Sequence, residues 1–115
     1  MSRVGTFANA NVSLTPQIFY ILLALASQDR HGYDIMKQVE VDSLRKIKLG
    51  PGTLYGALKR MLEEKLIMEI ASDSVRRKYY RLTSKGKAIF TSELTRYQAT
   101  IKLAEDRKLL HLAYV

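Results

Sequence analysis

The tract between residues 50 and 83 restricts the fold of this chain more than any other part of its sequence. The glycine- and proline-rich residues 50–53 are a strong break that leads into a helix start. An apolar stripe at helical spacing follows, formed by Leu54, Leu58, Met61 and Leu62. Two strand-like runs, at residues 66–70 and 75–82, then flank a polar turn at 71–74. The fold must therefore place a basic two-stranded hairpin directly after an amphipathic helix that ends near residue 64 or 65.

Helical patterns lie on both sides of this tract. Thr15 and Pro16 mark a helix start, and apolar residues at helical spacing predict a helix over residues 16–27. A second, short helix is predicted from about residue 33 to 41. A basic loop at 42–50 follows it, with a short strand around Ile47 and Leu49 as the alternative. Thr83 caps a final helix that is predicted to run from residue 84 to about 112.

The order helix, helix, helix, hairpin, long helix is that of a winged helix-turn-helix. We therefore predict a mainly α (α+β) fold, and a length of 115 residues fits a single compact unit. Residues 1–14 form an N-terminal arm or a short helix in this interpretation. Residues 15–83 form a winged helix-turn-helix DNA-binding domain, and residues 84–115 form a C-terminal dimerisation helix.

The positive charge of the chain is concentrated in its middle. Residues 45–87 hold twelve basic and four acidic side chains, a difference that equals the formal net charge of +8 of the whole chain. A local excess of this size favours a polyanionic partner, with nucleic acid first and an anionic membrane second. A solubilising face without a partner is the alternative, and charge alone does not separate the two.

Other function classes find little support in the sequence. The chain has no Cys, which excludes disulfides, thiol nucleophiles and cysteine-ligated metals. His31 and His111 are far apart and fit no metal motif, so we expect no enzyme activity, no metal site and no cofactor. The longest apolar run, residues 18–26, is too short to cross a bilayer, and residues 1–14 lack the apolar stretch of a signal peptide. We expect a cytoplasmic protein without a membrane partner.

The helix predicted after residue 53 has an outward side suited to nucleic acid. Its apolar stripe would pack inward, which turns the opposite side to solvent, with Tyr55 at the edge. The outward residues are Thr53, Gly56, Lys59 and Arg60. Small residues such as Gly52 let a helix start approach a phosphate backbone closely, and a major groove admits such a helix. The alternative is an ordinary helix start with solvated cations and a packing tyrosine.

The hairpin concentrates four cations in six residues, 76–81. Alternation along a strand puts Arg76 and Lys78 on one face and Arg77 and Arg81 on the other. Cations on both faces indicate an exposed ribbon that reaches phosphates or a minor groove. The alternative is an edge strand charged against aggregation, but fewer cations would be enough for that.

The final helix carries a heptad-like apolar seam. Its members are Phe90, Leu94, Tyr97, Ile101 and Ala104. A domain this small does not cover so long a helix on several sides, so we predict that the helix joins two copies of the chain. The alternative is that it folds back on the helix at residues 16–27 alone.

Three motifs resemble the PadR family of transcriptional regulators, specifically its short subfamily with one helix after the wing. They are His31-Gly32-Tyr33-Asp34-Ile35, Gly52-Thr53-Leu54-Tyr55 with Leu58 and Leu62, and Arg77-Lys78-Tyr79-Tyr80-Arg81-Leu82-Thr83 followed by Gly86. The resemblance covers residues 14–110. It implies a winged helix and a homodimer that binds double-stranded DNA at a palindromic operator, usually as a bacterial repressor.

The resemblance also implies roles for individual residues. Residues 52–60 would be the recognition helix, Tyr33 would stand at the start of the preceding helix, and residues 76–78 would lie toward the wing tip. Some members bind a small aromatic or hydrophobic effector between the two halves of the dimer, with a pair of Trp in multidrug sensors. This chain has no Trp, so the candidate pocket residues are Phe19, Tyr20 and Tyr97, for which core packing is the alternative.

The sequence thus predicts a DNA-binding regulator that contacts its operator through one defined set of residues. That set is Tyr33, Gly52, Thr53, Tyr55, Gly56, Lys59, Arg60, Arg76, Arg77 and Lys78. The alternative function is a winged-helix module that binds a protein or a ligand and no operator. The operator, the target gene, the effector and the sign of regulation are not encoded in these patterns.

Overall fold

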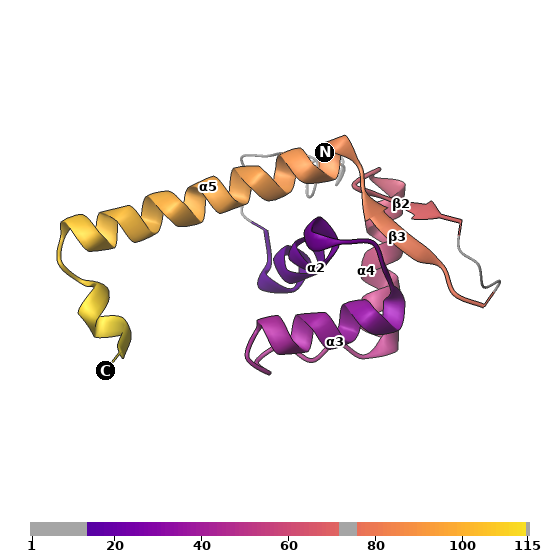
Figure 1. Cartoon of the computed structure of the whole chain (residues 1–115), viewed down its shortest axis with the longest axis horizontal. Helices are drawn as coiled ribbons and strands as arrows, with labels where there is room; N and C mark the ends of the chain where they lie inside the picture. The colour runs from indigo at the N-terminus through magenta and orange to yellow at the C-terminus, as the bar shows by residue number, and fades with distance from the viewer. Residues whose placement is uncertain (1–13, 72–75, 115) are drawn as a thin grey trace, which may run out of the picture.

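The computed structural model describes residues 14–71 and 76–114, and its elements follow the predicted order. They are α2 (Pro16–Ser27), β1 (Arg30–His31), α3 (Gly32–Asp42), α4 (Pro51–Glu63), β2 (Ile67–Ile70), β3 (Tyr79–Leu82), α5 (Ser84–Asp106) and the 3-10 helix η1 (Leu110–Tyr114). Figure 1 shows α2, α3 and α4 gathered beside a small sheet, with the long α5 leading away from them. The mainly α winged helix-turn-helix fold is confirmed.

The structure differs from the predicted elements in three places. The two-residue strand β1 lies between the first two predicted helices, where the sequence predicts no strand, and the alternative strand around residues 47–49 does not form. The C-terminal helix ends at Asp106 rather than near 112, because Lys108 adopts a left-handed backbone with a φ of 57°. Most of the predicted turn at 71–74 and of the arm at 1–14 lies outside the described residues.

The helix starts follow the local chemistry of the sequence. The Thr15 hydroxyl accepts a hydrogen bond from the N–H of Ile18 at 3.2 Å, and Pro16 occupies the first helical position. Thr83 caps α5 in the same way, accepting from the N–H of Gly86 at 3.0 Å. Helix α4 begins at Pro51 without a side-chain cap, so its first N–H groups stay open to another acceptor.

One apolar core joins the helices to the sheet. Three members of the predicted α4 stripe, Leu54, Leu58 and Met61, are each at most 1% exposed, and the fourth, Leu62, is partly buried against the same core. These side chains pack with the apolar faces of α2 and α3 and with the inward side chains of the sheet, Tyr80 and Leu82. Strand alternation therefore works as predicted within β3, where Arg81 is exposed between two buried neighbours.

A buried arginine fixes the angle between α2 and α3. Arg30 is 8% exposed, and its Nε donates to the Ala24 carbonyl at 2.8 Å near the end of α2. Its Nη1 lies 3.2 Å from both carboxylate oxygens of Asp34 in the first turn of α3. The side chain thus ties the end of one helix to the start of the next, which orients the helix-turn-helix.

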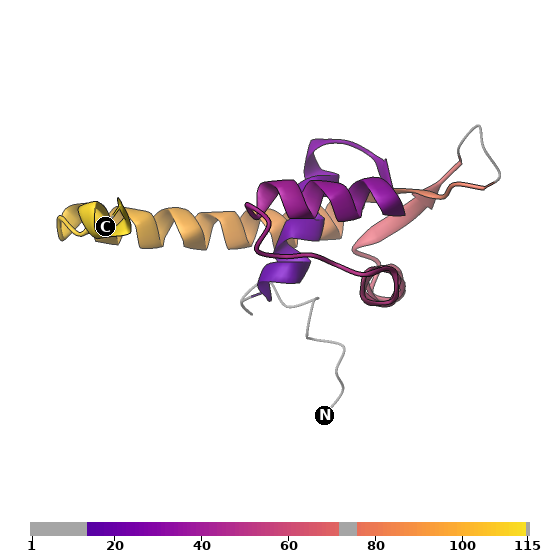
Figure 2. The ribbon, with the colours of Figure 1, turned by 90° about the horizontal axis from the view of Figure 1, so that it is seen from below.

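The sheet has the antiparallel order β1-β3-β2, with β3 in the centre. His31 pairs with Tyr79 and Arg30 with Tyr80, so the start of α3 is held against the hairpin. The hairpin formed by β2 and β3, here called the wing, projects from one end of the molecule (Figures 1 and 2).

Helix α5 extends from the domain on the side opposite the wing (Figure 2). The radius of gyration is 15.6 Å, above the roughly 13 Å of a compact chain of this length. Ile89 and Phe90 are buried against the core, whereas the apolar side chains beyond residue 93 are not. The projecting half of α5 therefore presents an uncovered apolar surface.

Candidate nucleic-acid interface

Helix α4 has the exposed outer side that the sequence predicts. All six candidate contact residues on it are exposed, namely Gly52, Thr53, Tyr55, Gly56, Lys59 and Arg60. A Cβ atom added at Gly52 or Gly56 would meet no atom within 4 Å. The helix surface is therefore low and open at these two positions, which leaves room for a backbone or a base edge to come close.

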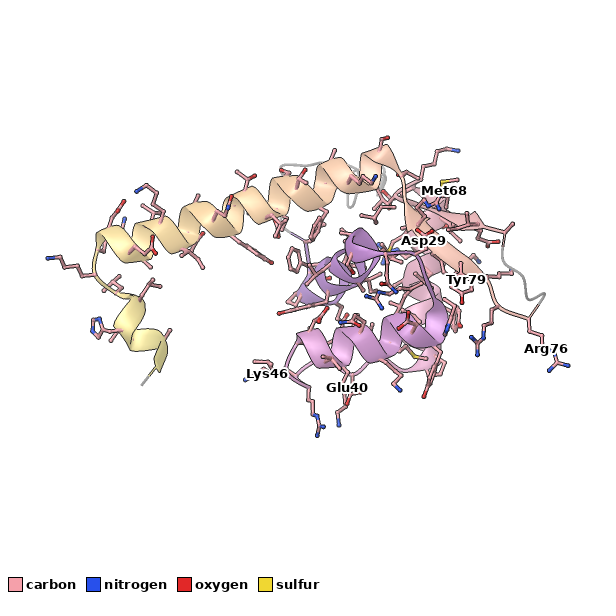
Figure 3. The ribbon with its side chains drawn as sticks, in the orientation of Figure 1. Asp29, Glu40, Lys46, Met68, Arg76 and Tyr79 are labelled. Carbon is pink, nitrogen blue, oxygen red and sulfur yellow. The ribbon has the colours of Figure 1, made fainter. Side chains whose placement is uncertain are left out.

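The wing carries its cations outward. Arg76, Arg77 and Lys78 are exposed, and Arg76 points away from the domain at the far end of the hairpin (Figure 3). Lys78 lies 3.9 Å from Glu69 of β2, an exposed pair that contributes little to stability. These side chains can reach a polyanion without disturbing the core.

A pocket of about 520 Å³ lies where the wing, the start of α3 and the start of α4 meet. Its lining residues are His31, Gly32, Tyr33, Tyr55, Arg76, Arg77, Lys78 and Tyr80. Five of the ten predicted contact residues therefore meet in one pocket. The other five lie on the outer side of α4 and do not line it. His31, Gly32 and Tyr80 were not predicted as interface residues.

Gly32 permits the close packing of α3 on α4 at this pocket. A Cβ atom at residue 32 would overlap the hydroxyl of Tyr55, so the tyrosine ring lies directly on the glycine. Tyr55 remains 48% exposed. One edge of the Tyr55 ring thus packs on Gly32, as the predicted alternative requires. The rest of the ring faces the pocket, where the predicted contact with nucleic acid would be made.

At least one basic residue of the α3–α4 loop lies away from this pocket. Lys46 stands at the end of α3 that is far from the wing, whereas Tyr79 and Arg76 lie at the wing itself (Figure 3). The charge excess of residues 45–87 is therefore divided between at least two places. The wing and α4 hold the part that surrounds the pocket.

An ion pair fastens the wing to the α2–β1 connection. Nη2 of Arg81 lies 2.7 Å from Oδ2 of Asp29, and Nε donates to Oδ1 at 3.0 Å. The hydrogen bond from Arg81 lowers the pKa of Asp29 below its ordinary value of 3.8. Both side chains are partly exposed, so the pair holds orientation more than it adds stability.

This pair gives a pH prediction. Because the folded pKa of Asp29 is depressed, its contribution is present above pH 3.8 and is lost as pH falls through the lower, folded value. We expect Asp29→Asn to lower the free energy of unfolding by about 0.5 kcal/mol at neutral pH. Urea titrations should show the gap to wild type closing below pH 3.8. A gap that is constant with pH would contradict this assignment.

The predicted effector-pocket residues do meet. Phe19 of α2 lies 4.8 Å from Tyr97 of α5 and 5.6 Å from Tyr20, measured between ring centroids. Phe19 also stacks on Phe90 at 5.5 Å, so Phe90 is buried within the protomer. Leu94, Tyr97 and Ile101 form the exposed part of the predicted seam, and Ala104 is half-buried.

Glu93 is a buried carboxylate that the sequence patterns do not reveal. It is 2% exposed, and its Oε2 accepts from the N–H of Leu14 at 3.0 Å. Its Oε1 lies 3.6 Å from Nε of Arg96. Burial, followed by the nearby charge of Glu93, raises the pKa of Tyr97. The carboxylate thus ties Leu14, which precedes the Thr15 cap of α2, to the middle of α5.

Within residues 14–71 and 76–114, no helix is long and apolar enough to cross a membrane. In the same residues, no group of three or more His, Cys, Asp or Glu side chains is arranged to hold a metal ion.

Comparison with known proteins identifies the family. Residues 21–92 match the model of the transcriptional regulator PadR-like family. The chain is 37% identical over 86 residues to an uncharacterized protein X of Lysinibacillus sphaericus, covering 71% of this chain and 77% of that one. A PadR family transcription regulator from Clostridium difficile R20291 has 31% identity and a TM-score of 0.66, covering 80% of this chain and 97% of that one.

A PadR-like transcription factor from Bacteroides fragilis has the same fold. It gives a TM-score of 0.64 at 23% identity, with 77% of this chain and 86% of that one covered. The family match includes α3, α4 and the wing, which together form the pocket. Its members are DNA-binding regulators rather than enzymes, in agreement with the sequence prediction. The chain therefore belongs to the PadR-like family of transcriptional regulators, and its winged helix-turn-helix is a DNA-binding domain.

Proposed function

We propose that the chain is a homodimeric, cytoplasmic repressor that binds a palindromic operator. Helix α4 enters the major groove in each half-site, and the wing contacts flanking phosphates. The observation that carries this proposal is the pocket between the wing, α3 and α4, where Tyr33 and Tyr55 gather with the cations of residues 76–78. A duplex strand that passes between the wing and α4 would meet these side chains together.

Two further observations support the arrangement. Open space at Gly52 and Gly56 lets the start of α4 approach the duplex closely. Two copies joined along α5 would present their α4 helices to half-sites spaced by about one turn, roughly 34–36 Å. Occupation of such a site near a promoter excludes other proteins from the same DNA.

The dimer surface proposed here is the exposed seam of Leu94, Tyr97 and Ile101, which are 37%, 41% and 52% exposed. A second copy that packs seam to seam would cover these side chains. A small aromatic or hydrophobic effector bound beside Phe19, Tyr20 and Tyr97 would contact Tyr97, which belongs to this same dimer surface. It would release DNA by changing the population of dimers whose two reading helices match the operator spacing.

Charge in the seam should separate the two copies. We expect Leu94→Glu with Ile101→Glu to convert the dimer to a species of 13.1 kDa, the mass of one chain, in light scattering. Buried unpaired carboxylates are costly at such an interface. The control is Thr95→Glu with Gln98→Glu, two exposed polar positions on the same helix, which should leave the mass unchanged. A wild-type protein that is monomeric at micromolar concentration would contradict the proposed dimer.

The experiment that tests the function is a titration with DNA from upstream of the chain's own gene, against scrambled duplex, at several salt concentrations. We expect a specific complex with two chains per operator, and log affinity that falls by roughly 0.9 per neutralised phosphate against log salt. Equal weak binding to both duplexes would contradict operator recognition at this site. No binding even at low salt would favour the alternative function, a module that binds a protein or a ligand.

A further inference from the structure

We propose that His31 donates a hydrogen bond to a DNA phosphodiester, and that the helix cap it forms selects the nitrogen that donates. This inference rests on the proposed function. It adds to that function a contact residue at the meeting point of α3 and the wing.

The cap determines which ring nitrogen carries the proton. Nδ1 of His31 faces the backbone N–H of Asp34 at 3.3 Å, in the first turn of α3. A backbone N–H only donates, so Nδ1 must accept. A neutral imidazole that accepts at Nδ1 carries its single proton on Nε2. The fold of the helix start therefore leaves Nε2–H as the donor of this ring.

The surroundings hold the ring beside the anion-binding side chains. His31 belongs to β1, which pairs with β3, and its ring stands edge-on to Tyr79 at 5.4 Å between centroids. The residue is half-buried and lines the pocket that also holds the cations of residues 76–78. Within the described residues, Nε2 of His31 has no hydrogen-bond partner, whereas Nδ1 has one.

The Asp34 carboxylate, in the first turn of α3, is already paired with Arg30. Both oxygens of Asp34 lie 3.2 Å from Nη1 of Arg30, which is itself buried between α2 and α3. Nε2 of this half-buried ring is therefore left to solvent in the free protein and can donate to a ligand that enters the pocket. The guanidinium, ammonium and phenol groups around it suit an anion with several oxygens, and a phosphodiester offers two unesterified oxygens to separate donors.

Two substitutions separate the roles of the two ring nitrogens of His31. His31→Asn keeps an acceptor near the position of Nδ1, and Asn is among the best helix caps, but it has no donor near Nε2. His31→Gln places an amide N–H₂ near Nε2 and loses the capping acceptor. Each variant thus keeps one function of the ring and removes the other.

The measurement is binding of fluorescent operator and scrambled duplex at about pH 8, where imidazole side chains are ordinarily neutral. For His31→Asn we expect a wild-type unfolding midpoint in urea and affinity for both duplexes reduced roughly 3- to 10-fold. The salt slope should not change, because a neutral donor releases no counterion. His31→Gln should unfold at lower urea and bind DNA more tightly than His31→Asn.

Lys78→Ala provides the matched comparison at the same pocket. It removes a charge and should lower the salt slope by about 1. His31→Asn that folds and binds both duplexes as tightly as wild type would overturn the proposal, as would a loss of affinity accompanied by a lower slope. Wild-type protein that binds both duplexes equally would contradict operator recognition, yet the drop for His31→Asn would still report the phosphate contact. Wild-type protein that binds no DNA would overturn both.

Discussion

Replacement of Arg76, Arg77 and Lys78 by alanine is expected to lower operator affinity roughly 100-fold near physiological salt and to reduce the salt slope by two to three. All three side chains are exposed at the end of the wing, and all three line the pocket beside Tyr33 and Tyr55. Each of these cationic side chains displaces a counterion from the duplex when it contacts a phosphate. The loss should be similar for operator and scrambled DNA, because phosphates carry no sequence information.

The fold should survive this triple substitution. The three side chains contribute nothing to the buried core, and the ion pair of Lys78 with Glu69 is long and exposed. We therefore expect the free energy of unfolding to stay within about 0.5 kcal/mol of wild type. Anisotropy titrations across salt, together with urea unfolding, check both halves of the prediction.

The matched control removes the same charge elsewhere. Lys46, Lys102 and Arg107 are exposed on the α3–α4 loop and at the projecting end of α5. Their joint replacement by alanine should change affinity and slope far less. Lys59→Ala on α4 should instead alter preference among operator sequences, because this residue faces the proposed major groove. Wing variants that bind operator like wild type would show that the wing does not contact DNA.

The regular parts of this fold could be predicted because one short-range rule determines each of them. Thr15 and Pro16 start α2, the stripe from Leu54 to Met61 forms the buried side of α4, and alternation buries Tyr80 and Leu82 in β3. The clustering of wing cations follows from their adjacency in sequence. None of these required knowledge of which segments meet in space.

The missed features all depend on contacts between distant segments. Strand β1 is two residues long and exists because β3 offers it a partner. Glu93 is buried where the N–H of Leu14, 79 residues earlier in the sequence, donates to it. Arg30 carried a local signal, since Asp34 lies four residues on, but its burial depends on the end of α2. His31 likewise becomes a pocket residue only once the wing folds beside it.

Gly86 shows that helix propensity alone underestimates how strongly a position can require glycine. Propensity alone treats a glycine in the first turn of α5 as a small penalty. In the folded chain, however, a Cβ atom at this position would overlap the backbone carbonyl oxygen of Leu66. That carbonyl accepts from the N–H of Thr83 at 3.0 Å, and the Thr83 hydroxyl donates to the Lys65 carbonyl at 2.6 Å. The glycine is therefore required by the junction between α4, β2 and α5.

Gly86→Ala is expected to lower the free energy of unfolding by about 3 kcal/mol, the upper part of the usual range for overpacking. The obstructing atom belongs to the backbone, so no side chain can rotate aside to make room. Urea unfolding monitored by circular dichroism measures the change. Gly56→Ala is the matched control: it lies on the exposed side of α4 with nothing within 4 Å, and should be about 0.5–1 kcal/mol more stable than wild type.

The opposite signs of these two glycine substitutions would separate packing from propensity, since both place the same methyl group in a helix. If Gly86→Ala is as stable as wild type, α5 must be able to move away from Leu66 without cost. In that case the junction would not fix the angle between α5 and the wing. If Gly86→Ala loses much stability, α5 is rigidly coupled to the winged helix-turn-helix at Gly86 and Thr83. A change at the α5 seam would then move both wings of the proposed dimer together.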